Sequence, residues 1–81
     1  DEKTNKLRQE VENIISQISP HISMHDFRVV WGPSHCNLIF DVVVPYDYDS
    51  GEEELIQLIT EKIAQLNENY RPVITIDRSY T

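Results

Sequence analysis

Two stretches of the chain repeat apolar residues at the spacing of an amphipathic helix. In the first, residues 4–19, the apolar side chains share one stripe: Leu7, Val11, Ile14, Ile15 and Ile18. Thr4 is a suitable N-cap because its hydroxyl can accept a hydrogen bond from a free backbone N–H. Pro20 predicts the end of this helix because it lacks a backbone donor and clashes with the preceding turn.

The second helix is predicted to begin at Ser50. Ser50 and Glu53 match the S-x-x-E capping box, and residues 52–54 place negative charge near the positive end of the helix dipole. Its apolar stripe consists of Leu55, Ile56, Ile59, Ile63 and Leu66. The sequence Asn-Glu-Asn at residues 67–69 predicts its end.

Three other stretches alternate in the manner of strands: residues 26–31, 36–44 and 72–77. The first two are joined by turn residues, Gly-Pro-Ser-His at 32–35, and so predict a β-hairpin. One face of these two strands is apolar and contains Phe27, Val29, Trp31, Leu38, Phe40, Val42 and Val44. In the third strand, Val73 and Thr75 point to one face and Ile74 and Ile76 to the other.

The resulting order, α-β-β-α-β, predicts a single α+β domain over residues 1–81. A strand–helix–strand connection is right-handed, so the third strand should run parallel to the second in a mixed three-stranded sheet. Each helix has a single apolar stripe, so both are expected to pack on one face of that sheet.

The opposite sheet face is predicted to lack a covering layer. It carries four apolar residues interrupted by three polar ones: Val30, Ile39, Val43, Val73, Arg28, Asp41 and Thr75. Such a patch is large for so small a chain, and a second copy would cover part of it in a homodimer. The alternative is a mildly apolar face in contact with solvent.

The charge of the chain narrows the class of partner. Fourteen acidic and seven basic residues give a net charge of −7, which argues against a nucleic-acid partner and against an anionic membrane surface. Cations and basic protein surfaces fit it better. No apolar run approaches the roughly 20 residues of a membrane span, so we expect no direct membrane insertion. Because the chain begins at Asp1 rather than Met, we expect it to be a piece of a longer protein.

Catalytic patterns are few, and the sequence does not predict an enzyme. His35 and Cys36 are neighbours, but successive strand residues point to opposite faces, which disfavours a Cys–His nucleophile. Cys36 is better explained as a small, partly buried residue, and as the single cysteine it cannot form an internal disulfide. No phosphate-binding glycine loop is present.

The candidates for metal binding are scattered along the chain. Residues 47–51, Asp-Tyr-Asp-Ser-Gly, resemble a calcium loop, but the glycine comes too early and the closing glutamate is misplaced. His21 and His25 are four residues apart, yet Pro20 and the following strand argue against a helix there.

A spatial cluster at the sheet is the stronger prediction for a metal site. It would combine imidazole and carboxylate groups, which suit zinc and similar ions: His25, Asp26, His35, Asp41 and Asp77. Aspartate is depleted in the middle of strands, which sets Asp41 apart. The alternative is that the histidines are simply exposed and that Asp26 and Asp77 pair with nearby arginines, namely Arg28, Arg71 or Arg78.

Several segments resemble the cytosolic C-terminal domain of cation diffusion facilitators. They are residues 25–30 (His-Asp-Phe-Arg-Val-Val), 32–35 (Gly-Pro-Ser-His) and 37–45 (Asn-Leu-Ile-Phe-Asp-Val-Val-Val-Pro). Residues 73–80 (Val-Ile-Thr-Ile-Asp-Arg-Ser-Tyr) are similar to the same domain in the clostridial and related Gram-positive branch. The resemblance extends over about residues 7–80.

The resemblance implies a metallochaperone-like (ferredoxin-like) domain that follows six transmembrane helices in a transporter. Such transporters are homodimers that export zinc, manganese, iron, cobalt or similar ions in exchange for protons. The domain would therefore lie on the cytoplasmic side of the membrane, with the transmembrane domain of its own chain and a second copy as partners. In the family it dimerises and binds a regulatory divalent ion, zinc in the first place, near the two-fold axis.

Only some of the family's metal-ligand positions hold a potential ligand in this sequence. The first-strand histidine corresponds to His25, with Asp26 beside it, and the second-strand ligand to Asp41. The two third-strand ligand positions hold Ile76 and Arg78, on either side of Asp77. Three interpretations stay open: a different ligand set that includes His35 or His21, weak binding, or dimerisation alone. The leading hypothesis is a metal-sensing dimerisation domain, and the competing one is a metal-independent structural module.

Overall fold

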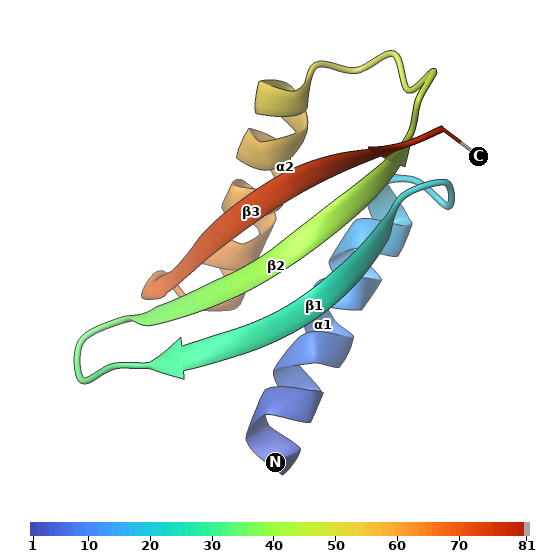
Figure 1. The fold of residues 1–81 in the computed structure, drawn as a ribbon. Coiled ribbons are helices and arrows are strands. Elements are labelled where there is room, and N and C mark those ends of the chain that lie inside the picture. Colours follow the sequence, from blue (N-terminus) through green and yellow to red (C-terminus); the bar gives the residue numbers. More distant parts are fainter. Residues whose placement is uncertain (81) are drawn as a thin grey trace.

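Two helices and three strands make up the computed structural model, which describes residues 1–80 (Figure 1). In chain order they are α1 (Glu2–Ile18), β1 (Ser23–Trp31), β2 (Cys36–Pro45), α2 (Glu52–Leu66) and β3 (Tyr70–Ser79). The predicted order α-β-β-α-β is confirmed.

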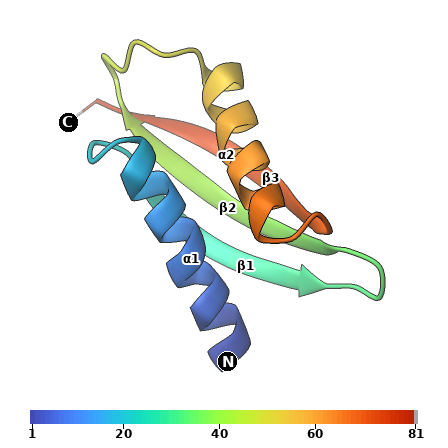
Figure 2. The ribbon, with the colours of Figure 1, turned by 180° about the vertical axis from the view of Figure 1, so that it is seen from behind.

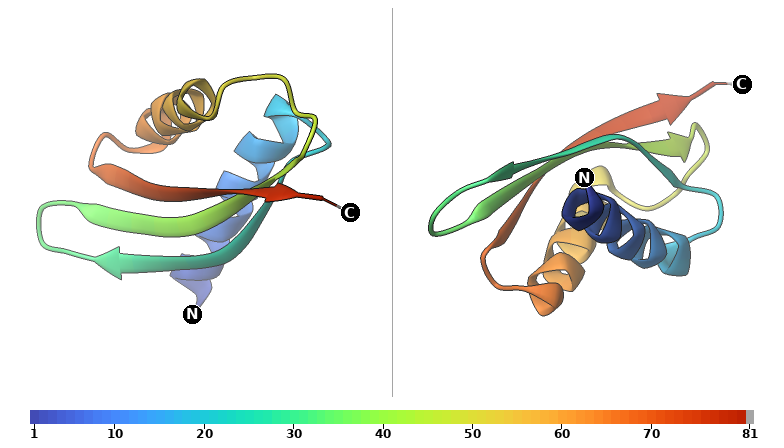
Figure 3. Two further views of the ribbon diagram at one scale, coloured as in Figure 1. Left: turned by 45° about the horizontal axis from the view of Figure 1, so that its top comes forward. Right: turned by 90° about the horizontal axis from the view of Figure 1, so that it is seen from below.

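The strands form one mixed sheet in the order β1-β2-β3. β1 and β2 are antiparallel, and β2 and β3 are parallel, as expected for strands joined through α2. Both helices lie against the same face of the sheet, and the other face is uncovered (Figure 2, Figure 3). This is an α+β arrangement of the ferredoxin-like kind, as predicted.

The hydrophobic core fills the space between the helices and the sheet. Its centre is β2, where the side chains of Leu38, Phe40, Val42 and Val44 are at most 1% exposed. The helices supply most of the predicted stripes, but Leu66 is 40% exposed and Ile14, Ile18 and Ile56 are only half-buried. The remaining buried residues are Leu7, Val11, Ile15, Ile22, Leu55, Ile59 and Ile63. The side chains that alternate along β2 therefore determine which face of the sheet the helices cover.

The predicted N-caps of both helices are wrong, by three residues at α1 and by one residue at α2. Asp1, not Thr4, is the N-cap of α1, because the Asp1 carboxylate accepts a hydrogen bond from the Thr4 backbone N–H at 2.7 Å. At α2 the N-cap is Gly51 and no side chain caps the helix. Ser50 lies one residue before that cap, so the predicted capping box with Glu53 does not form.

A β-bulge in β1 sets the phase of its side chains. The register shifts between His25, which lies opposite Asp41, and Arg28, which lies opposite Ile39. Asp26 sits in the bulge with a φ of 56°, a left-handed conformation that aspartate tolerates better than most residues. The extra residue keeps both His25 and Arg28 on the uncovered face of the sheet.

Candidate functional site

The uncovered face of the sheet, here called the open face, carries the predicted apolar patch. Val30 and Val73 are 55% and 52% exposed, and Ile39 and Val43 are half-buried. These side chains come from all three strands, because cross-strand neighbours point to the same side. The open face thus combines exposed and half-buried apolar side chains from all three strands.

Four of the five predicted ligands gather at one end of the open face. Asp41 lies directly opposite His25 on β1, and on its other side it lies opposite Thr75 on β3. Residues that pair across the three strands form a row, and Asp77 lies in the row next to that of Asp41, opposite Val43. Together with Asp26 in the bulge, these carboxylates form what we call the acidic cluster: Asp26, Asp41 and Asp77.

Asp41 is the electrostatic centre of the acidic cluster. Partial burial raises the pKa of the Asp41 carboxyl above its ordinary value, and a hydrogen bond to Asp26 raises it further. The negative charges of Asp26 and Asp77 act in the same direction, and Arg28 opposes them. The carboxylates are therefore close enough to repel one another, which favours a proton or another cation among them.

Asp41→Asn is expected to stabilise the protein at neutral pH. Folding raises the pKa of Asp41, so protonated Asp41 favours the folded state. This contribution to the free energy of unfolding is complete below pH 3.8 and is lost as the pH rises through the pKa of Asp41 in the folded protein. Asparagine stays neutral throughout, so its advantage over wild type should shrink as the solution becomes acidic. Urea unfolding across this pH range measures the effect, with Asp49→Asn, an exposed residue of the β2–α2 connection, as control. A variant less stable than wild type at neutral pH would contradict it.

His35 is separated from the other predicted ligands. It lies in the hairpin turn, whose nearest strand pair is Trp31 and Cys36. Asp41 is five residues further along β2 than Cys36, a distance of about 17 Å. The His35 carbonyl accepts a hydrogen bond from the Gly32 N–H at 3.1 Å, and a Cβ at Gly32 would lie 2.6 Å from that oxygen. The turn thus requires glycine there, and His35 closes it.

The described chain does not by itself present a closed set of metal ligands. Among residues 1–80, no group of three or more His, Cys, Asp or Glu side chains is arranged to hold a metal ion. The His25 imidazole makes a hydrogen bond of 3.0 Å with the Ser23 hydroxyl. Ile76, at one of the family's ligand positions, packs against the core instead. A metal at the acidic cluster would need further donors, such as water or a second copy.

Arg78, at the other family ligand position, organises the β2–α2 connection. Its Nε donates to Glu52 Oε2 at 3.1 Å, and its Nη1 donates to the carbonyls of Tyr46 at 3.1 Å and Tyr48 at 3.2 Å. The same nitrogen lies 3.4 Å from the Pro45 carbonyl. The ion-pair partners expected for Arg78 from the sequence were Asp26 or Asp77, whereas its observed partner is Glu52. The acidic start of α2 was the available signal for its actual partner.

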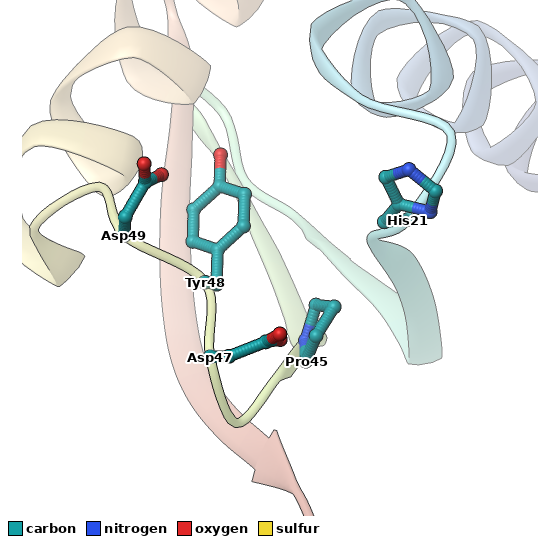
Figure 4. Close-up of a pocket in the computed structure, with 5 residues that line it drawn as sticks. All are labelled: His21, Pro45, Asp47, Tyr48 and Asp49. Carbon is teal, nitrogen blue, oxygen red and sulfur yellow. The ribbon is translucent and has the colours of Figure 1, made fainter.

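A separate cleft of about 530 Å³ lies beside this connection (Figure 4). It is lined by His21, Pro45, Asp47, Tyr48 and Asp49. The imidazole of His21 comes from the turn between α1 and β1, and the other four residues belong to the end of β2 and the loop after it (Figure 4). No member of the acidic cluster lines this cleft.

The fold is similar to that of a solved structure from work on the mode of action of CzrB, a candidate zinc transporter. The TM-score is 0.70 at 18% sequence identity, and the match covers 91% of this chain and 94% of the other. No protein-family model and no curated protein matches the sequence. The described residues contain no helix that is both long enough and apolar enough to cross a bilayer. The structural likeness shows a shared fold.

Proposed function

We propose that this chain is the regulatory and dimerisation domain of a divalent-cation efflux transporter of the cation diffusion facilitator type. The segments at residues 25–30, 32–35, 37–45 and 73–80 resemble that family, and the fold is shared with CzrB over nearly the full length of both chains. In this proposal the domain lies on the cytoplasmic side, attached to the transmembrane domain of its own transporter, and forms a homodimer. It has no enzymatic role.

The acidic cluster beside His25 is the observation that carries the regulatory part of the proposal. Carboxylate and imidazole groups are ligands for zinc and also for manganese, iron and cobalt. Since Asp26, Asp41 and Asp77 already repel one another, a divalent ion would relieve that repulsion. Because one subunit lacks a closed ligand set within residues 1–80, we place the ion between the open faces of two copies.

Titration with zinc or manganese should raise the melting temperature by linkage. At a free metal concentration ten times the Kd, the stabilisation is about 1.4 kcal/mol, which corresponds to roughly 5–10 °C for a domain of this size. Asp41→Asn and His25→Ala should lose most of this shift. Asp49→Asn, which removes an equal charge outside the open face, should keep it. No shift in the wild type at millimolar metal would exclude metal sensing.

The second candidate function is a structural dimerisation module that needs no metal. It is favoured by the exposed Val30 and Val73 and by the lack of a closed ligand set within one subunit's residues 1–80. Sedimentation of the protein in chelator and in metal separates the two functions. A dimer of equal affinity in both favours the structural module, whereas a dimer that responds to metal favours sensing.

A further inference from the structure

The charges on the open face are separated along the strands. The acidic cluster occupies the end where β2 and β3 finish. The other end carries two arginines, Arg28 in the row of Ile39 and Arg71 opposite Asn37. Arg71 and Asp77 lie on the same strand and the same face, six residues or about 20 Å apart. The face therefore has an acidic end and a basic end.

This separation decides how two open faces can pack on each other. A two-fold axis that runs across the strands, between the rows of Ile39 and Asp41, reverses the strand direction of the second copy. Arg71 then lies opposite Asp77 of the partner subunit, and Arg28 lies opposite His25 of the partner subunit. By symmetry the Arg71–Asp77 contact occurs twice, so the arrangement pairs opposite charges at two places.

A two-fold axis that runs along the strands gives the opposite result. Each row of residues paired across the strands then faces the same row of the second copy, so Asp41 lies against Asp41 of the partner subunit. Arg71 then lies opposite Val30 of the partner subunit and gains no charge partner. Like charges that face each other across an interface are strongly unfavourable. This second arrangement therefore requires a cation between the acidic ends.

We propose that, without metal, two copies of this chain pair through their open faces with reversed strand direction, held by two Arg71–Asp77 contacts between subunits. The proposal rests on the proposed function in taking the open face as the homodimer interface, and it adds the arrangement of that interface. In the described part of the chain Arg71 forms no ion pair of its own, so its charge is available to a partner.

The area of the open face makes these charge pairs important. Three strands about 4.8 Å apart and roughly 25 Å long give a contact of about 400 Å² per subunit. A stable interface buries about 800 Å² per partner. Association should therefore be weak, should require high protein concentration, and should weaken as salt screens the pairs.

A charge exchange tests the arrangement by sedimentation equilibrium in chelator at low salt. Arg71→Asp and Asp77→Arg should each weaken the dimer at least tenfold, because each converts two attractive contacts into repulsive ones. The double variant restores opposite charges and the wild-type net charge, so its dimer affinity should return to within about threefold of wild type. Lys6→Asp is the matched control, since Lys6 is exposed on α1, away from the open face.

The outcomes separate this inference from the proposed function. Recovery in the double variant supports the arrangement, even if added manganese has no effect, in which case metal sensing fails. A wild-type dimer that both single variants leave intact, or that the double variant fails to restore, overturns the arrangement. A chain that stays monomeric in chelator but dimerises with manganese also overturns it and leaves the proposed function in place.

Discussion

Replacing Phe40 with alanine should lower the free energy of unfolding by about 3–5 kcal/mol. Phe40 is 1% exposed at the middle of β2, and its ring lies 5.8 Å from that of Phe27, centroid to centroid. The substitution removes the buried ring and leaves a cavity beneath both helices. A domain of this size has little stability to spare, typically about 5–15 kcal/mol. Urea unfolding followed by circular dichroism measures the loss.

Two variants on β-strands serve as controls for Phe40. Phe40→Leu keeps much of the buried volume and should lose clearly less stability than alanine. Val73→Ala removes methyl groups from the open face, where the side chain is 52% exposed, and should change the free energy by about 0.5 kcal/mol or less. Equal losses for Phe40→Ala and Val73→Ala would show that the helices do not cover the face that contains Phe40.

Arg78→Ala is expected to cost about 2 kcal/mol, the second-largest loss among these variants. The guanidinium joins the end of β3 to Glu52 and to the carbonyls of Tyr46 and Tyr48, so its removal frees the whole β2–α2 connection. Part of the loss is recovered by water, since the Arg78 side chain is 27% exposed. Hydrogen exchange should accelerate at the amides of residues 46–51, and chemical unfolding gives the energy.

Two arginine variants separate the role of the Arg78 contacts from that of its charge. Arg78→Lys keeps the charge but lacks the planar group that reaches several acceptors at once, so its stability should fall between wild type and alanine. Arg71→Ala removes an exposed arginine from the same strand and should have an effect below about 0.5 kcal/mol. If Arg78→Ala matched Arg71→Ala, the connection would not depend on Arg78.

The fold was largely predictable because helix and strand periods are local properties. The alternation of Leu38, Phe40, Val42 and Val44 identified the covered face of β2, and the same face is buried in the structure. Helix starts were less predictable. Asp1 and Thr4 are both good capping residues, and which of them caps α1 depends on where the helix docks on the sheet.

The candidate site was predictable in its residue types and only partly in its membership. Asp41 attracted attention because aspartate is unusual in the middle of a strand, and the structure places it beside His25. The His35 imidazole is as suitable a metal ligand as that of His25, but the hairpin places it at the opposite end of β2 from the acidic cluster. Proximity depends on strand register, and the bulge at Asp26 shifts that register in a way that alternation alone does not reveal.

The sequence by itself determined the α-β-β-α-β order, the covered sheet face and the excess of negative charge, because each follows from residues close together in the chain. Only the tertiary structure decided which charges meet. Arg78 reaches Glu52, 26 residues away, and Asp41 is affected by Asp77 from a neighbouring strand. Such contacts depend on how the strands pair and where the loops return. Salt screens charge interactions beyond about 10 Å, so only charges that the fold brings together interact strongly. The pairing of strands therefore turns scattered acidic and basic residues into an open face with two oppositely charged ends.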